Sequence, residues 1–521
     1  MTTLRSLVRT GIFVAGLAVL AAPALSSPAG VPPYDGALDP TLNPPGGAPP
    51  FWAAIPGLFD FGVDLGGGSP YTNVDTAAAV AVQTDGKIVV AGYSWNTFNG
   101  NDENACVLGR FNADGTVDSG FGSSGRVVVN MAGSGQTDCY FNAIALQGDG
   151  KIVVAGNTNN ASFEQGFVGR YNADGSPDNA FNNGGTGNYA YAGQHSSFNA
   201  IAIGSDGTIY TAGRAFQNGH SDNDFFYEAW AGNNGNAMFW NWNAFNLGGD
   251  NDDRAAAVVL QEDVCLSTPC FLHDELYLVG FANNTPYGDG LNNHDCAIAA
   301  YSRAPGDSMF SLDTGFNGSG QETIDFPMAP DNEGDNICRA AVGQSPYVGG
   351  LVIGGENYFF STLGGNPPGL ASYYALAKVD AAGTVTREDL LANYYEDAFP
   401  GIFNGISAMA WQADGKLLIA GYAGTDVPSN APSDMGLARY NPDFSFDISF
   451  GPQSSGKETL SLDGQGGANA AQQEWVNAMA IVRRAIVRQR QPVDVLHGEP
   501  RTSAGIDTTV DQARDTGVLE A

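Results

Sequence analysis

The chain has 521 residues, 55 of them acidic and 22 basic, and its formal net charge at pH 7 is −33. A protein that binds duplex nucleic acid needs a basic surface, so this balance excludes nucleic acid as a partner and disfavours an anionic membrane face. It favours cations, or basic groups on a partner, as ligands. The 70 glycines, with Asn, Asp and Ser between short apolar runs, predict many short strands joined by tight turns.

The first 26 residues have the pattern of a signal peptide. Arg5 and Arg9 precede the apolar stretch 11–22, which is too short to span a bilayer comfortably, and small residues follow it. We expect residues 1–26 to be cleaved and the mature protein to be secreted, periplasmic or held at the cell surface. No later run reaches about 18 apolar residues, so we expect no transmembrane segment in the mature chain.

An N-terminal segment, 27–75, precedes a repeat region that covers residues 76–482. The repeat is clearest in an anchor that reads QTDGKIVVAG, then QGDGKIVVAG, and later QADGKLLIAG. Six copies of this anchor are spaced by roughly sixty residues, in the range typical of repeat architectures. They lie at 83–92, 147–156, 205–213, 274–280, 349–355 and 412–421.

Each anchor has the same neighbours, and together they predict four strands per repeat. A run of small apolar residues, an Asp-Gly turn and the anchor indicate a β-hairpin. A motif of the type VGRYNADG, at 168–175, ends at a second Asp-Gly and indicates the third strand, and a D-x-x-F segment leads to the fourth. Four antiparallel strands form a propeller blade. We therefore predict an all-β fold, a β-propeller of six or seven four-stranded blades.

These motifs closely resemble the delta-60 repeat family of secreted bacterial proteins. The DGKIVVAG, GRYNADG and D-x-x-F-G segments carry the resemblance, which covers roughly residues 76–482. The resemblance implies a propeller. It implies no activity, because the family is defined by its repeat and not by a reaction.

The two ends of the repeat region predict how the ring closes. Residues 34–43 resemble the latter part of a repeat, and residues 475–482 resemble the start of one. Together they would form a seventh blade shared between the N- and C-terminal segments, and closure would remove sheet edges that invite aggregation. Residues 483–521 have no repeat features and are predicted to be a disordered tail.

The six cysteines allow 15 full pairings, but the repeat register narrows them. Cys106 and Cys296 fill the same place in the third-strand motif of the first and fourth repeats. Cys139 and Cys338 each lie just before the first strand of the next repeat. We predict Cys106–Cys139 and Cys296–Cys338 as two copies of one bridge; the alternative is free buried thiols. The remaining pair, in an insertion at 264–273, is predicted to close a small loop: Cys265 and Cys270.

An aspartate recurs at the start of the third strand, as Asp224, Asp295 and Asp434. Recurrence at one place predicts a role in stabilising the blade. Arg439, five residues after Asp434, is the expected partner in the last repeat.

Acidic loops are the candidates for binding a cation. Loops rich in Asp, Asn and backbone carbonyls supply the oxygen ligands that Ca²⁺ requires. The loops at 248–253 and 331–336 are the densest, and neither is an EF-hand. The alternative is that they form Asx turns and solvated loop tips. If Ca²⁺ binds, the predicted ligands are Asp250, Asp252, Asp253, Asp331, Glu333 and Asp335.

No motif in the sequence identifies an enzyme. There is no G-x-S-x-G elbow, H-E-x-x-H pair, P-loop or C-x-x-C pair, and none of the five histidines lies at metal-ligand spacing from another. We therefore assign no catalytic residue and no cofactor apart from Ca²⁺. We predict a monomeric, exported, non-enzymatic binding or scaffold protein that presents propeller loops to a protein, glycan or cation ligand. The alternative is an extracellular glycan-active hydrolase or lyase with a site at the mouth of the propeller channel.

Overall fold

The computed structural model describes most of the repeat region. The chain divides into two units, 1–484 and 485–521, and all described residues belong to the first. The predicted tail, 483–521, and most of the segment 27–75 lie outside the described residues. The described residues are 14–21, 75–98, 101–129, 136–160, 163–181, 188–189, 195–216, 223–243, 253–265, 272–284, 293–326, 335–344, 349–361, 369–386, 403–424, 433–451, 456–460 and 474–482.

Every regular element in the described residues is a β-strand, and the strands form six blades of a β-propeller, as predicted. In each blade the strands follow one another outward in chain order. The first blade holds β2 (Asp75–Val82), β3 (Ile88–Phe98), β4 (Asn101–Phe111) and β5 (Arg126–Val129). The second holds β6 (Gln136–Leu146), β7 (Ile152–Asn160), β8 (Glu164–Tyr171) and β9 (Asn188–Tyr189). The third holds β10 (Ser196–Ile203), β11 (Ile209–Phe216), β12 (Asn223–Trp230) and β13 (Ala237–Asn243).

The last three blades follow the same plan. The fourth has a split outer strand: β14 (Arg254–Cys265), β15 (Leu272–Asn284) and β16 (Asn293–Arg303), which pairs with both β17 (Ser311–Leu312) and β18 (Gln321–Ile324). The fifth holds β19 (Asp335–Gly343), β20 (Leu351–Ser361), β21 (Gly369–Val379) and β22 (Val385–Thr386). The sixth holds β23 (Phe403–Trp411), β24 (Leu417–Gly424), β25 (Ser433–Tyr440) and β26 (Lys457–Leu460).

The inner strand of every blade carries a bulge at the same place, and this explains why each anchor ends in glycine. At the bulge the inner strand has one extra residue opposite the second strand of the hairpin. A Cβ atom on the anchor glycine would lie only 1.7–2.0 Å from a backbone oxygen of the inner strand. No other residue fits there without moving the backbone. The six glycines are Gly92, Gly156, Gly213, Gly280, Gly355 and Gly421.

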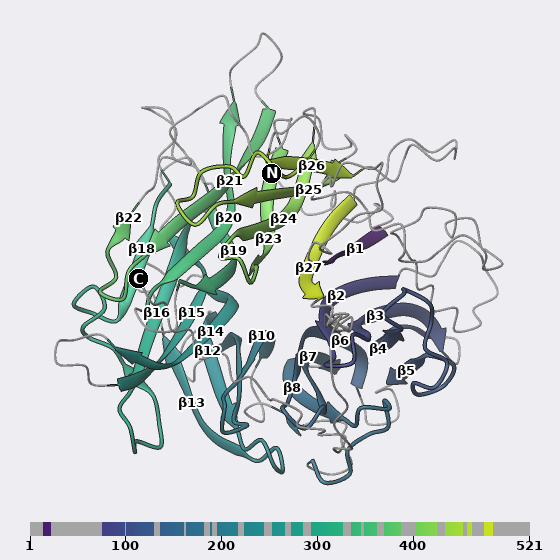
Figure 1. Ribbon diagram of the computed structural model, residues 1–521. Coiled ribbons are helices and arrows are strands. Elements are labelled where there is room, and N and C mark those ends of the chain that lie inside the picture. Colours follow the sequence, from purple (N-terminus) through teal and green to yellow (C-terminus); the bar gives the residue numbers. More distant parts are fainter. Residues whose placement is uncertain are drawn as a thin grey trace, which may run out of the picture. The chain divides into compact units, whose positions relative to one another are not determined.

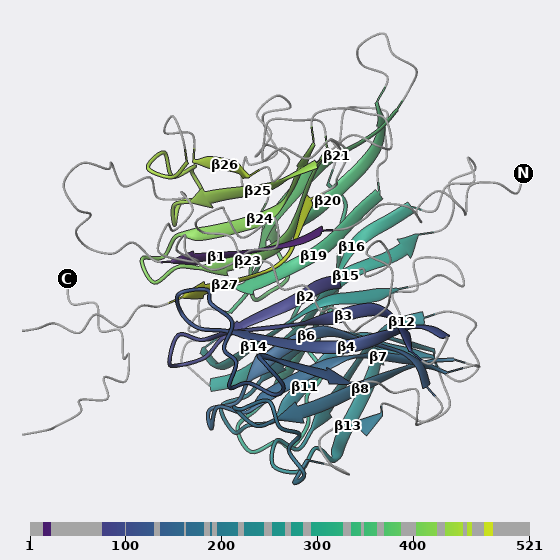
Figure 2. The same cartoon turned by 90° about the vertical axis from the view of Figure 1, so that its right-hand side faces the viewer.

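A seventh inner strand, β27 (Glu474–Val482), lies between the sixth and first blades, where it contacts β23 and β2 (Figures 1 and 2). Its Asn477 donates a 2.9 Å hydrogen bond to the carbonyl of Ala77 in the first blade. Asn199, at the same bulge position in the third blade, likewise donates to the carbonyl of Ala255 in the fourth. β27 therefore takes the place of the inner strand of a further blade and closes the ring.

The N-terminal contribution to this closure differs from the expectation. The strand that pairs with β27 is β1 (Val14–Ala21), in parallel orientation, and residues 34–43 lie outside the described residues. β1 falls within the predicted signal peptide. Cleavage after residue 26 stays a prediction, and it would remove β1 from the mature protein. The described residues include no helix long and apolar enough to cross a membrane.

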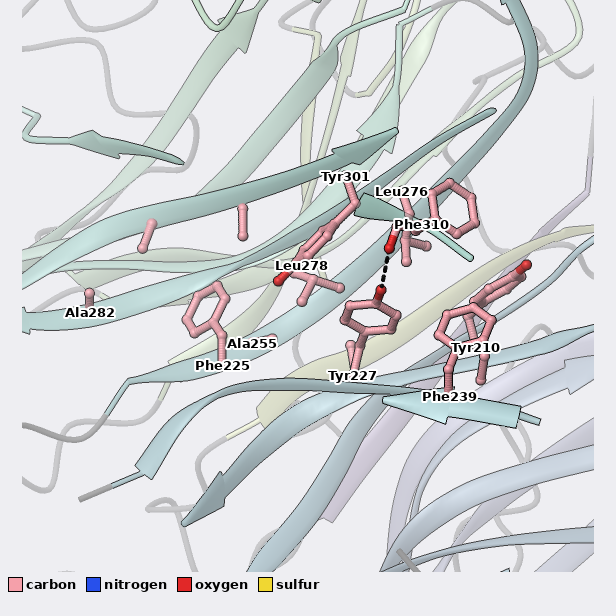
Figure 3. Close-up of a cluster of buried hydrophobic side chains, with 14 residues drawn as sticks. Tyr210, Phe225, Tyr227, Phe239, Ala255, Leu276, Leu278, Ala282, Tyr301 and Phe310 are labelled. Atoms are coloured by element: carbon pink, nitrogen blue, oxygen red, sulfur yellow. Dashed lines mark hydrogen bonds between the residues drawn. The ribbon is translucent and has the colours of Figure 1, made fainter. Parts of the chain in front are cut away.

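The hydrophobic core is a series of layers between successive blades. Figure 3 shows the layer between the third and fourth blades, where Tyr227 meets Tyr301 edge to face at a ring distance of 4.8 Å. The same cluster brings Phe225 of β12 against Leu278 of β15. Equivalent clusters lie between the other neighbouring blades and between the sixth blade and β27. No single blade buries its apolar side chains alone.

Two of the three predicted disulfides are confirmed. Cys106–Cys139 joins the first blade to the second, and Cys296–Cys338 joins the fourth to the fifth, with Cα–Cα distances of 5.0 and 5.1 Å. The bridge between Cys265 and Cys270 stays a prediction, because Cys270 lies outside the described residues.

Removing β27 should open the ring. Val476 is fully buried against the sixth blade, and burying one such side chain contributes about 1.5–3 kcal/mol. A chain that ends after residue 460 should therefore unfold at a lower temperature than the full chain. A chain that ends after residue 484 keeps the first unit whole and is the control. Equal melting temperatures of the two truncated chains, measured by circular dichroism, would contradict this account of closure.

Candidate functional site at the inner strands

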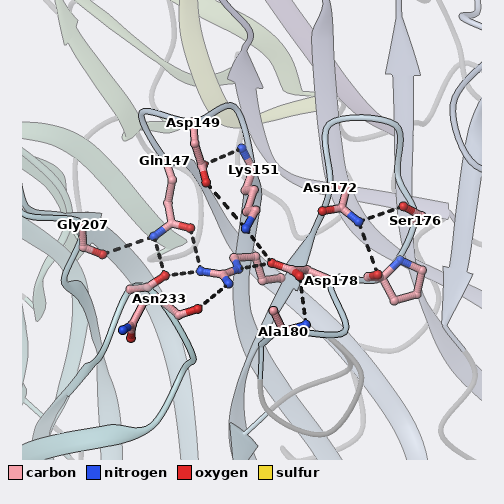
Figure 4. A network of polar contacts seen from close by, with 12 residues as sticks. Gln147, Asp149, Lys151, Asn172, Ser176, Asp178, Ala180, Gly207 and Asn233 are labelled. Atoms are coloured by element: carbon pink, nitrogen blue, oxygen red, sulfur yellow. Dashed lines mark hydrogen bonds and ion pairs between the residues drawn. The ribbon is translucent and has the colours of Figure 1, made fainter.

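The strongest polar network of each regular blade is structural. Arg170 of the second blade is almost fully buried, and its Nε donates a 2.8 Å hydrogen bond to Asp178 Oδ2. Figure 4 shows Asp178 together with Lys151, which also contacts this carboxylate. The other nitrogens of Arg170 reach the third blade, where they donate to the carbonyls of Gly232 and Asn233. The guanidinium also lies 4.4 Å from the centre of the Phe181 ring. The GRYNADG and D-x-x-F motifs thus supply an arginine and an aspartate that join neighbouring blades. This group of Arg170, Asp178 and the anchor lysine Lys151 is called the latch below.

Asp178 is held in its charged form. Burial raises its pKa, but hydrogen bonds from Lys151 and the backbone of Ala180, with the charge of Arg170, lower the pKa below its usual range. The first blade has the same latch, formed by Arg110 with Asp118 and Lys87. The sixth blade repeats the group of Arg, Asp and Lys within the blade, as Arg439 with Asp447 and Lys416. The predicted pairing of Arg439 with Asp434 is wrong: Arg439 Nε donates to Asp447 at 2.6 Å.

A different group stands out on the inner strands. At the bulge position the described inner strands carry small or uncharged residues, apart from Arg339 of β19. These residues are Ala78, Asn142, Asn199, Ala256, Ser407 and, on β27, Asn477. The Arg339 side chain is 44% exposed. This side chain is exposed although three strands surround β19: β20 pairs with it, and β14 and β23 contact it.

Glu356 holds Arg339 in place. Its carboxylate, 1% exposed, accepts hydrogen bonds from Nε of Arg339 at 2.7 Å and from Nη2. It also accepts one from the hydroxyl of Tyr422 in the sixth blade. A planar guanidinium bonded twice to a buried carboxylate has little rotational freedom, so the cation is oriented in advance. Arg339, Glu356 and Tyr422, here called the inner triad, join the fifth and sixth blades.

A glycine makes room for the inner triad. Gly405 of β23 pairs with Tyr422, and a Cβ atom on it would lie 2.5 Å from the tyrosine ring and 2.7 Å from the Glu356 carboxylate. The hydrogen bond between Tyr422 and Glu356 therefore requires glycine at position 405. The sequence contained a signal for this group. The residue after each anchor glycine is Tyr93, Asn157, Arg214, Phe281, Glu356 or Tyr422, and only the fifth blade has a carboxylate there.

The described part of the chain shows no cluster of the cation ligands that the sequence predicts. Asp250, Asp252, Asp331 and Glu333 lie outside the described residues, as does the side chain of Asp335. Asp253 is buried, and its Oδ1 accepts a hydrogen bond from the backbone of Asn283 at 3.1 Å. Among the described side chains, no three His, Cys, Asp or Glu residues gather to hold a metal ion. The Ca²⁺ site in these loops stays a prediction.

Two buried glutamates depart from the repeat. Glu228 of β12 stands where the other five blades have Gly109, Gly169, Ala299, Ala377 and Ala438. It shares a strand face with Phe226 and Trp230, which pack between the second and third blades. Its Oε2 has no hydrogen-bond partner among the described residues, and burial raises its pKa to about 8. The second, Glu275 of β15, stands where the first blade has Lys87.

Comparison with known proteins supports the propeller and adds no activity. Residues 83–121, 147–181 and 412–450 match a family described as a domain of unknown function (DUF5122), beta-propeller. These segments lie in the first, second and sixth blades, and the match agrees with a β-propeller repeat family. No curated protein matches the chain.

Several solved structures have a similar arrangement of strands. The α-L-arabinofuranosidase Arb93A from Fusarium graminearum, in complex with an iminosugar inhibitor, has 10% sequence identity and a TM-score of 0.35; the match covers 70% of this chain and 93% of that chain. A protein of unknown function from Dyadobacter fermentans has 14% identity and a TM-score of 0.32, covering 70% and 96%. Drosophila plexin A, in complex with semaphorin 1b, has 9% identity and a TM-score of 0.28, covering 75% and 80%. Likenesses at this level carry no information on activity or ligand.

Glu228 should make stability depend on pH. Its pKa rises from 4.5 in the unfolded chain to about 8 in the folded protein, so the folded state holds the proton over a wider range. The contribution of Glu228 to the free energy of unfolding is therefore fully present below pH 4.5. It is lost as pH rises toward 8, by at most about 1.4 kcal/mol per pH unit. Denaturant unfolding between pH 5 and 8 should show a shallower loss of stability in Glu228→Gln than in the unchanged protein. The same substitution at an exposed carboxylate, Asp307→Asn, should leave the slope as it was. Identical slopes for Glu228→Gln and the unchanged protein would show that Glu228 is charged in the folded state.

Proposed function

We propose that this protein is an exported binding protein whose propeller binds a neutral glycan at the inner triad. The observation that supports the proposal is Arg339, a charged and exposed side chain on an inner strand, held rigid by a buried carboxylate. Polar groups whose geometry is set before binding give a ligand site its orientation and specificity. The departure of Arg339 and Glu356 from the other blades indicates that the ring itself does not need them.

The charge of the protein favours a neutral ligand over an anion. An anionic ligand would meet a chain of net charge −33, although Arg339 alone would attract it. Sugar hydroxyls can accept hydrogen bonds from Arg339 and donate to carboxylate or carbonyl oxygens without that repulsion. The Tyr422 ring adds an apolar face beside these polar groups.

Export and family are part of the proposal. The signal pattern of residues 1–26 and two disulfides support an oxidising compartment outside the cytoplasm. The repeat motifs support membership of the delta-60 repeat family. We expect a monomer, since the ring closes on itself through β27.

Binding to neutral oligosaccharides tests the proposal. Isothermal titration of the mature protein with a panel of such oligosaccharides should identify a ligand, and Arg339→Ala should weaken binding by about tenfold to a hundredfold, as expected for a lost hydrogen bond to a charged group. Ser407→Ala, at the same bulge position in the sixth blade, is the matched control and should bind like the unchanged protein. Melting temperatures of both variants exclude a general loss of folding. Binding that survives Arg339→Ala would locate the site elsewhere, and no binding to any member of the panel would reject a neutral glycan ligand.

One observation favours an enzyme as the second candidate. The Tyr422 hydroxyl donates to a buried carboxylate, which is the arrangement of a nucleophile beside a general base. If the protein is a glycan-active hydrolase, incubation with the bound oligosaccharide should release shorter products. Tyr422→Phe should then abolish release and preserve binding. Recovery of the intact oligosaccharide would reject the hydrolase and would leave binding as the proposed function.

A further inference from the structure

The latch that joins regular blades is altered in the fourth blade. In the first blade, Asp118 Oδ2 lies 2.8 Å from Nε of Arg110 and 2.9 Å from Nζ of Lys87. Two cations thus meet one carboxylate between the first and second blades. Strand pairing and backbone hydrogen bonds identify the corresponding residues of the fourth blade.

Glu275, Ala300 and Asp313 take the places of Lys87, Arg110 and Asp118. The backbone of Asp313 donates to Ala300 at 2.9 Å, as Asp118 donates to Arg110 at 2.9 Å. The backbone of Ala300 also donates to Gly320 at 2.9 Å, as Arg110 donates to Gly125. The arginine is thus replaced by alanine and the lysine by glutamate, whereas the aspartate is kept.

Among the residues that the structure describes, the two carboxyl groups have few partners. Glu275 is 0% exposed, and neither of its carboxyl oxygens has a hydrogen-bond partner among the described residues. Asp313 Oδ1 accepts a hydrogen bond from the backbone of Gly315. The two groups face one another, because Lys87 and Asp118, whose places they take, lie 2.9 Å apart in the first blade. An unpaired carboxylate in this position would be expensive to bury.

The surroundings offer further oxygen ligands. In the first blade the Arg110 guanidinium donates to the carbonyl of Ala173 in the next blade. In the fourth blade Tyr277, which pairs with Ala300, takes the place of that guanidinium: its ring meets Phe316 edge to face at 5.9 Å, and its hydroxyl accepts a hydrogen bond from the backbone of Gly350. The residue of the fifth blade that matches Ala173 is Ala381, because Asn317 donates to Ala382 as Gly122 donates to Asp174. Two carboxylates and a carbonyl are hard oxygen ligands, and two negative charges balance one divalent ion.

We propose that a divalent cation of the oxygen-binding class, Ca²⁺ or Mg²⁺, binds between the fourth and fifth blades on Glu275 and Asp313. The ion takes the place that the lysine ammonium has beside the aspartate in the regular latch. Backbone and water oxygens complete its coordination, since no third acidic or histidine side chain gathers there among the described residues. This site is separate from the acidic loops at 248–253 and 331–336, and it does not depend on the inner triad.

Metal titrations of the full chain test the site. After chelation and dialysis, Ca²⁺ or Mg²⁺ should bind by calorimetry and should raise the melting temperature, because a ligand that binds only the folded state stabilises it. Glu275→Gln and Asp313→Asn should each lose most of this shift. Preference for Ca²⁺ would indicate a site of many flexible ligands, and preference for Mg²⁺ a smaller octahedral one. The double variant Asp250→Asn with Asp252→Asn, in the acidic loop, should keep the shift.

A restoring variant guards against a simple failure to fold. Glu275→Lys returns the lysine of the regular latch and places it beside Asp313, as Lys87 lies beside Asp118. It should fold without metal, melt in chelator at or above the temperature of the unchanged protein, and no longer respond to either ion. The proposal is overturned if the unchanged protein responds to neither ion, if the shift survives Glu275→Gln or Glu275→Lys, or if the loop variant abolishes it.

Discussion

Each blade of this propeller is stable only because another blade covers it. A four-stranded sheet with apolar side chains on both faces has no core of its own, and every core cluster combines side chains from neighbouring elements of the ring. The polar groups obey the same constraint: Arg170 satisfies an aspartate of its own blade and two carbonyls of the next. The last blade would present an uncovered face, and β27 covers it. Closure is therefore a condition for the stability of all the blades.

Because every blade needs the same contacts with its neighbours, residues that depart from the repeat are candidates for a function. The first, second and sixth blades show that the latch, the anchor glycine and the bulge are sufficient to build a blade. A buried carboxyl group without a partner lowers stability, so its presence calls for a compensating role, which in proteins is commonly a functional site. Glu228, Glu275 and the pair of Arg339 with Glu356 are such departures. Glu356 is satisfied within the protein, whereas both oxygens of Glu275 and one of Glu228 have no partner among the described residues.

Contacts that depend on the repeat register could be predicted from the sequence. Contacts that depend on a bulge, or on which face of a strand a side chain occupies, could not. Copies of one motif occupy equivalent places, so equating Cys106 with Cys296 was sufficient to predict two disulfides. The pairing of Arg439 with Asp434 failed because residues five apart in a strand point to opposite faces of the sheet. The sequence marks Glu356 as a departure from the repeat but does not pair it with Arg339 and Tyr422, since these residues are 17 and 66 positions away and meet Glu356 only because Arg339 sits on a bulge and Gly405 lacks a side chain.

The scarcity of cations in this chain connects the latch to the net charge. Only 22 of 521 residues are Lys or Arg, and the regular blades each use two of them to neutralise one buried aspartate. The fourth blade uses neither and adds a carboxyl group, which increases repulsion in a protein that already carries a large negative charge. A cation taken from the surroundings would supply the missing positive charge at this one interface. Since the ring needs every interface, occupancy of a single site would then affect the stability of all six blades.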